Sequence, residues 1–321
     1  TVNKKLCLST AVLTLLSPFA AFADDPTGPT VWDGFSGWLS PDWSRDFSAT
    51  AGVKVWVNEW SRDLFLSQTA TLSDGTVLTI VDTGPDSQES DIEAVPIPQL
   101  SARYKWLFVT GSYYSKTEFD FEPTFGQIQL SDSSGNITDS LSTRFEVSGE
   151  RYEWDASGGI YVHPYVAILG GYKKVSQTLD QTVTSTLGDE PPAVTLGFNT
   201  IDIEGPTIGI AGSVPIGRGF GMYASYAHGF MNVEARTVVT SPCCSDDGDQ
   251  DVEFDADYDV AEAGFSYTHG MDRLMPHLPL SAATVYAGYR YQVISTDLQD
   301  LGNQDRSDVT KGFAVGLNLT F

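Results

Sequence analysis

The chain lacks an apolar run long enough to cross a membrane as a helix, which takes about 18 uninterrupted residues. Its longest apolar stretch, residues 6–21, is shorter and is broken by Ser, Thr and Pro. A helical membrane protein is therefore excluded on length. Strands remain available as membrane spans, because only alternate residues of a barrel strand face lipid and the overall composition then stays average.

Positive charge is also scarce. The 321 residues include 18 Lys and Arg against 42 Asp and Glu, which gives a net charge of −24. A surface of this sign repels the phosphates of nucleic acid, so we expect no nucleic-acid partner. The balance favours cations as partners, or a solvated and self-repelling exterior.

The first 23 residues have the pattern of a secretory signal peptide. Two lysines precede the apolar stretch, and Ala21, Phe22 and Ala23 form a small-x-small cleavage site. Residues 24–46 are predicted to be a Trp-rich periplasmic arm or a plug in a lumen. Residues 47–321 would then make up the folded domain.

The end of the chain alternates with the period of two that is typical of a strand. One face carries the apolar side chains Phe313, Val315, Leu317, Leu319 and Phe321, and the other carries Gly, Ala, Asn and Thr. This arrangement suits a strand with lipid outside and a narrow polar lumen inside. A terminal aromatic residue that ends such an alternation resembles the C-terminal signature of bacterial outer-membrane β-barrels, which their assembly machinery recognises.

Upstream, long polar segments alternate with pairs of tightly joined strands. This rhythm predicts ten spans of about 9 to 14 residues, with aromatic side chains near the span ends. The expected fold is all-β: a transmembrane antiparallel up-and-down barrel of about ten strands in a bacterial outer membrane. Eight or twelve strands stay open, because the segment after Trp60 contains a possible hairpin.

Strand parity places a set of charged residues of both signs on the lumen face. They are Lys54, Arg103, Arg151, Glu153, Asp155, Glu262 and Arg290. A charge facing hydrocarbon would cost about 2 to 4 kcal/mol, so these side chains should point inward and pair. They form either a salt-bridged plug, in a barrel little wider than the eight-stranded type, or the lining of a gated or narrow selective pore.

The most acidic predicted external loop surrounds residues 241–253. Asp246, Asp247, Asp249 and Asp251 are candidate Ca²⁺ ligands, although their spacing does not fit an EF-hand and a solvated acidic loop is the alternative. Beyond such a divalent cation, no cofactor is expected.

Two cysteines lie in the same loop. Cys243 and Cys244 are the only cysteines after the leader, and an oxidising compartment favours pairing. Adjacent cysteines can close only a strained ring, so free thiols or an intermolecular bridge are the alternatives to a vicinal disulfide.

Histidine, the usual general base, occurs four times. Three of the histidines fall at predicted turns, and His228 lies on the lipid face in the outer half of its span. No Gly-x-Ser-x-Gly elbow and no metal-type His/Glu motif occurs. An enzyme is therefore not expected, except as a hydrolase that uses His228 with a Ser or acidic neighbour.

Together these features predict an outer-membrane barrel with a structural or surface-interaction role. Its expected partners are outer-membrane lipids, lipopolysaccharide and the outer-membrane assembly machinery. A narrow channel for small solutes or ions is the first alternative, and a hydrolase is the second.

Overall fold

The computed structural model describes residues 47–63, 67–71, 77–82, 87–131, 137–186, 193–240, 248–271, 277, 279–296 and 306–321. The predicted signal peptide and Trp-rich arm lie outside these residues. Within them, all regular structure is β-strand, and no helix is long and apolar enough to cross a membrane.

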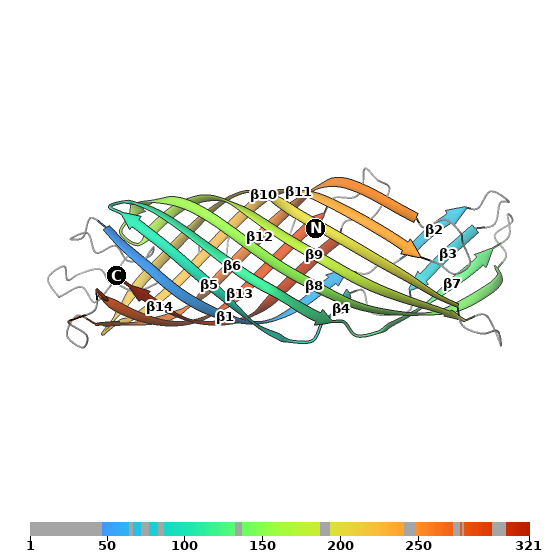
Figure 1. Ribbon diagram of the computed structural model, residues 1–321, viewed down its shortest axis with the longest axis horizontal. Coiled ribbons are helices and arrows are strands. Elements are labelled where there is room, and N and C mark those ends of the chain that lie inside the picture. The colour runs from blue at the N-terminus through green and yellow to red at the C-terminus, as the bar shows by residue number, and fades with distance from the viewer. Residues whose placement is uncertain are drawn as a thin grey trace.

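Ten antiparallel strands close into one barrel, in which they run obliquely to its long axis (Figure 1). They are β1 (Phe47–Asp63), β5 (Glu93–Tyr104), β6 (Leu107–Asp120), β8 (Ile137–His163), β9 (Val166–Thr186), β10 (Ala193–Gly217), β11 (Phe220–Thr240), β12 (Gly248–Gly270), β13 (Ala282–Thr296) and β14 (Arg306–Thr320). The last strand closes the barrel by pairing with both β13 and β1, so that Val315 lies opposite Ala287 and Val55. The predicted up-and-down barrel is confirmed, with ten spans.

The two ends of the barrel differ in how their strands are joined. At the turn end, where the C mark stands in Figure 1, three of the four connections are tight, and the fourth joins β12 to β13 through residues 271–281. Lys105 and Arg218 adopt positive φ angles of 54° and 52° there, and Gly217 and Gly219 adopt 114° and 85°. At the opposite end, the loop end, β8 to β12 continue well past the shorter strands because they contain 21 to 27 residues.

Four short strands extend the sheet at the loop end. They are β2 (Ser67–Thr71), β3 (Val77–Asp82), β4 (Ser87–Glu89) and β7 (Thr124–Ser131). The first two form a hairpin, as the segment after Trp60 suggests. They pair onward through β7 to β8, whereas β4 pairs with β1. Beyond the barrel the sheet is therefore open and runs in the order β2-β3-β7-β8-β9-β10-β11-β12, which we call the outer wall.

The exterior of the barrel is apolar. Phe313, Val315 and Leu317 are 68%, 53% and 42% exposed, which is the reverse of an ordinary soluble core. Most of the exposed aromatic side chains lie towards the two edges of this apolar belt. At the turn end they are Phe47, Tyr104, Trp106, Phe220, Tyr267 and Phe321, and towards the loop end Tyr113, Trp154, Tyr172, Phe230, Tyr289 and Phe313. Two such girdles are typical of strands that cross a bilayer.

The interior of the loop-end half is packed with apolar side chains. Trp60 contacts Phe119 and Phe121 edge to face, with ring centroids 5.4 and 5.1 Å apart. A Cβ added to Gly149 would come within 2.8 Å of the Trp60 ring, so the missing side chain makes room for the indole. A second cluster joins Val175, Ile203, Met231, Val233, Ala256, Tyr258 and Ile294. Buried apolar side chains therefore occupy the lumen here.

Candidate functional site

A network of buried charges crosses the middle of the lumen. Its members come from six strands and are Lys54, Arg151, Glu153, Lys173, Glu262, Arg290 and Asp308. We call this set the lumen network. Glutamine, tyrosine and tryptophan side chains connect its parts.

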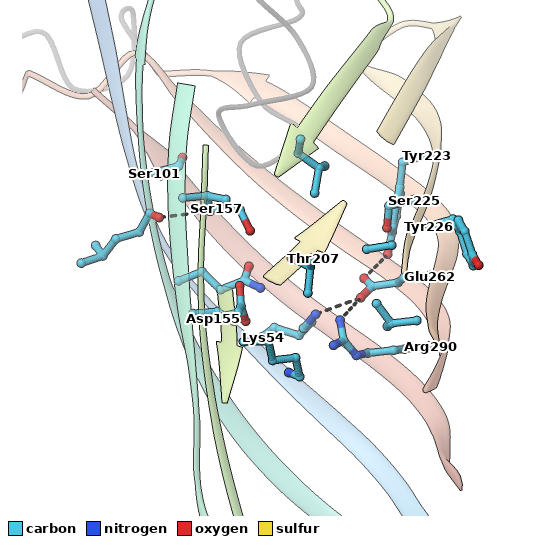
Figure 2. Close-up of a pocket in the computed structure, with 18 of the residues that line it drawn as sticks. Lys54, Ser101, Asp155, Ser157, Thr207, Tyr223, Ser225, Tyr226, Glu262 and Arg290 are labelled. Carbon is cyan, nitrogen blue, oxygen red and sulfur yellow. Dashed lines mark hydrogen bonds and ion pairs between the residues drawn. The ribbon is translucent and has the colours of Figure 1, made fainter. Parts of the chain in front are cut away.

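Glu262 on β12 forms one centre of the lumen network. Its carboxylate accepts hydrogen bonds from Lys54 Nζ at 2.9 Å, from Arg290 Nη1 at 3.3 Å and from the Tyr223 hydroxyl at 3.1 Å. Figure 2 shows Lys54 and Arg290 converging on this carboxylate from below and Tyr223 reaching it from above. Three donors on one carboxylate satisfy a charge that would otherwise be costly to bury.

Glu153 on β8 forms the second centre. It accepts from Arg151 Nε at 2.8 Å, from Lys173 Nζ at 2.6 Å and from Gln292 Nε2 at 2.8 Å. The glutamine comes from β13, so this bond spans the lumen. Arg151 and Glu153 are 0% and 2% exposed, which places the pair out of reach of bulk solvent.

Further contacts join the two centres and anchor them to aromatic rings. Arg290 Nη2 donates to Gln292 Oε1 at 3.2 Å, and Arg151 Nη1 donates to Asp308 Oδ1 at 2.8 Å. Asp308 also accepts from the Trp60 indole at 2.8 Å. The guanidinium of Arg151 lies 5.3 Å from the Trp60 ring, and that of Arg290 lies 5.1 Å from the Trp56 ring. Cations held over aromatic faces gain further stabilisation where water is excluded.

Two residues of the sequence-predicted lumen set lie apart from this network. Arg103 is buried near the turn end, where its Nε donates to the Ser48 hydroxyl at 3.3 Å. Asp155 accepts a hydrogen bond from Ser112 and faces the cavity described below. The other five predicted residues meet in the network, whereas Lys173 and Asp308 are members that the sequence analysis did not select.

A cavity of about 150 Å³ lies on the turn-end side of the lumen network. Lys54, Lys173, Glu262 and Arg290 line it at the network side. Its remaining wall combines apolar side chains such as Leu169 and Val260 with hydroxyl and amide side chains, namely Thr50, Gln99, Ser101, Thr110, Ser112, Ser157, Thr207, Ser225 and Asn318. A cavity of this size that offers several polar partners holds ordered water readily.

His228 lies on the outside of the barrel at the loop-end border of the apolar belt. Its Nδ1 is 2.9 Å from Asp259 Oδ1, and its Nε2 is 3.8 Å from Asp257 Oδ1. The Tyr226 hydroxyl donates to the same Asp259 oxygen at 2.5 Å, and the Phe230 ring packs edge-on against the imidazole. This cluster supplies an oriented base, and no hydroxyl or thiol nucleophile contacts the imidazole among the described residues.

The candidate metal ligands are divided between two regions. Asp249 and Asp251 belong to the start of β12, while Asp246, Asp247 and the neighbouring Cys243 and Cys244 lie outside the described residues. Within the part of the chain that the structure describes, no group of three or more His, Cys, Asp or Glu side chains is arranged to hold a metal ion.

No protein-family model matches the chain, and neither does any curated protein. Among solved structures, the outer-membrane protease OmpT from Escherichia coli aligns at 11% identity and a TM-score of 0.49, covering 85% of this chain and 97% of its own. The toluene transporter TodX of Pseudomonas putida aligns at 12% identity and 0.31, covering 90% and 92%. A FadL homologue of Pseudomonas aeruginosa aligns at 8% identity and 0.26, covering 91% and 93%. Likenesses this distant say nothing about substrate or activity.

The distribution of apolar and charged side chains identifies the class of barrel. A closed antiparallel barrel with an apolar, aromatic-bordered exterior and paired charges inside has the solvent preference of a membrane-spanning barrel. This chain has the fold of a bacterial outer-membrane β-barrel.

Proposed function

We propose that this outer-membrane barrel is closed to solutes and that its role is structural or lies in interactions at the cell surface. The observation that supports this most is the lumen network, whose charges are paired across the full width of the barrel and packed against Trp56 and Trp60. Both indoles are fully buried, so packed side chains occupy the part of the lumen that water would fill in a channel.

The outer wall supports the second half of the proposal. Barrels of this class have short periplasmic turns and longer extracellular connections, so we expect the loop end to lie outside the cell. Five barrel strands and the β2, β3 and β7 extension form an open sheet there. A protein that builds so much ordered sheet above its membrane belt has a large surface to offer to partners. The exterior contacts in the membrane are expected to be outer-membrane lipids and lipopolysaccharide.

Planar-bilayer recording of the refolded protein tests the closed lumen. We expect no discrete conductance steps, with insertion verified by protection of the barrel strands from added protease. Steps whose size changes in Glu153→Gln or Arg290→Gln would overturn the proposal. They would favour the narrow channel instead, for which the cavity beside the lumen network is the supporting observation.

A hydrolase is the second candidate, because His228 and Asp259 form a hydrogen-bonded base and orienting carboxylate at the membrane border. Such an enzyme would need a water molecule as its nucleophile. The test is release of fatty acid from phospholipid vesicles by the wild type and by His228→Ala, with His269→Ala, at an exposed histidine near the turn end of β12, as the control. We expect no turnover in any of the three proteins, and turnover that only His228→Ala abolishes would establish the hydrolase.

A further inference from the structure

Within the described part of the chain, the outer wall ends in a sheet edge at the start of β12. Residues 248–255 pair with β11 from Gly248 opposite Val239 to Asp255 opposite Asn232. The ladder between β12 and β13 begins only at Ala256, which pairs with Thr296. Among the described residues, no strand pairs with Gly248–Asp255 on the β13 side. Every second residue of such an edge leaves its backbone N–H and C=O unpaired by sheet.

The side chains along this edge give it a strong chemical preference. Asp251, Glu253 and Asp255 share one face and are all exposed. Successive side chains on one face of a strand are about 6.7 Å apart, so these carboxylates form a regular acidic ladder. On the opposite face, Val252 is 39% exposed and Phe254 is only half-buried.

Of the residues that the structure describes, those on the neighbouring strand β11 bring little positive charge to this ladder. On β11, Arg236 approaches Asp251 only to 4.0 Å, and Glu234 stands directly opposite Glu253. Like charges directly opposite each other destabilise a sheet. The fold therefore bears an electrostatic cost along this edge that a basic neighbour on the open side would relieve.

We propose that Gly248–Asp255 is a docking edge to which an extended basic segment of another protein adds as the next strand. The partner carries Lys or Arg at every second position, where each cation meets one carboxylate of the ladder. Apolar residues between them cover Val252 and Phe254. Backbone hydrogen bonds supply the pairing, and the alternation of charge sets the register. This inference rests on the proposed surface role and names the chemical class of the partner.

Charge also argues against two other occupants. The same edge of a second copy would bring one acidic ladder against another. Residues 297–305 of the same chain contain Asp297, Asp300 and Asp305 but no Lys or Arg, so they oppose the ladder in the same way. Acidic residues on an exposed edge disfavour pairing between identical chains, because their charges repel. They still allow pairing with a basic strand.

The test uses the full-length protein in detergent micelles and a capped heptapeptide of alternating lysine and valine with threonine at both ends. A second peptide of the same sequence is N-methylated at alternate backbone amides, which retains its charge but blocks strand pairing. We expect saturable binding of the first peptide and loss of binding for the second. New protection from amide hydrogen exchange should appear in Gly248–Asp255.

Two triple variants separate the edge from general acidity. Asp251→Asn/Glu253→Gln/Asp255→Asn should weaken binding about eightfold, since each of the three cross-strand charge pairs is worth about twofold. The matched control is Asp180→Asn/Asp202→Asn/Glu204→Gln, whose sites lie on β9 and β10 and are paired on both sides. It should bind as the wild type does.

Three results would overturn the docking edge: undiminished binding of the N-methylated peptide, equal weakening by both triple variants, or protection that appears elsewhere or nowhere. The peptide comparison uses the wild type and so does not depend on the folding of any variant. If the peptide test fails and the bilayer recording shows no conductance steps, only the docking edge is refuted. Conductance steps refute the closed barrel whatever the peptide does.

Discussion

Removing the charge of Glu153 should be one of the most damaging conservative changes in the barrel. Glu153→Gln keeps the shape of the side chain but leaves Lys173 without its carboxylate and leaves Arg151 with Asp308 alone. All three buried side chains of this centre are less than 5% exposed. Loss of one partner from a buried ion pair costs about 3 to 5 kcal/mol, because the remaining charge stays buried and uncompensated.

A matched control lies on the same strand. Glu146 pairs with Arg144 at 2.6 Å, but both side chains are about half exposed, at 47% and 49%. Solvent screens such a pair, so Glu146→Gln should cost less than about 1 kcal/mol. Both variants are compared by equilibrium urea unfolding in lipid vesicles, followed by tryptophan fluorescence. Equal small losses in the free energy of unfolding of the two variants would mean that water screens Glu153 as well. This result would refute the exclusion of water from the lumen network and favour a pore.

Two further perturbations test the exterior and the lumen packing by the same unfolding measurement. Leu317→Arg in the apolar belt should lower the free energy of unfolding by about 2 to 4 kcal/mol. Asn232→Arg, at an exposed site of the outer wall, should change it by no more than about 0.5 kcal/mol. Similar losses in the two variants would argue against the apolar belt. Gly316→Val should cost about 1 to 3 kcal/mol because its side chain would meet the Tyr286 ring. That cost should fall by at least about 0.5 kcal/mol in a Tyr286→Ala background, and strictly additive effects would contradict the contact.

The architecture of the barrel was largely predictable because it depends on period and parity. The alternation from Phe313 to Phe321 placed these side chains on one face, and β14 does close the barrel by pairing with β1. The number of spans followed from alternating long and short connections. The strands extend beyond the predicted spans of about 9 to 14 residues, and β8 has 27 residues. The alternation continues unchanged where a strand leaves the membrane, so it does not mark the boundary.

Parity also separates lumen from lipid, but it does not identify partners. Asp308 shares its face with Gly312 and Ala314, so its inward direction could have been found from the sequence. Lys173 was harder, because both faces of its strand are mixed. The contact between Glu153 and Gln292 joins residues 139 positions apart. Such a contact depends on the stagger of the closed barrel, which no local pattern records.

The small residues on the lumen face illustrate the same limit. Glycines at 264, 288 and 316 predict a face without bulky side chains, which suits an open pore as well as a plug. In the structure these glycines make room for aromatic rings. Tyr223 packs against Gly264 and Gly288, and Tyr286 packs against Gly316. The width of the lumen therefore depends on the side chains that reach across it. A conducting variant would require removal of rings such as Tyr286 and Trp56, because neutralising charges alone would leave the lumen as full as before.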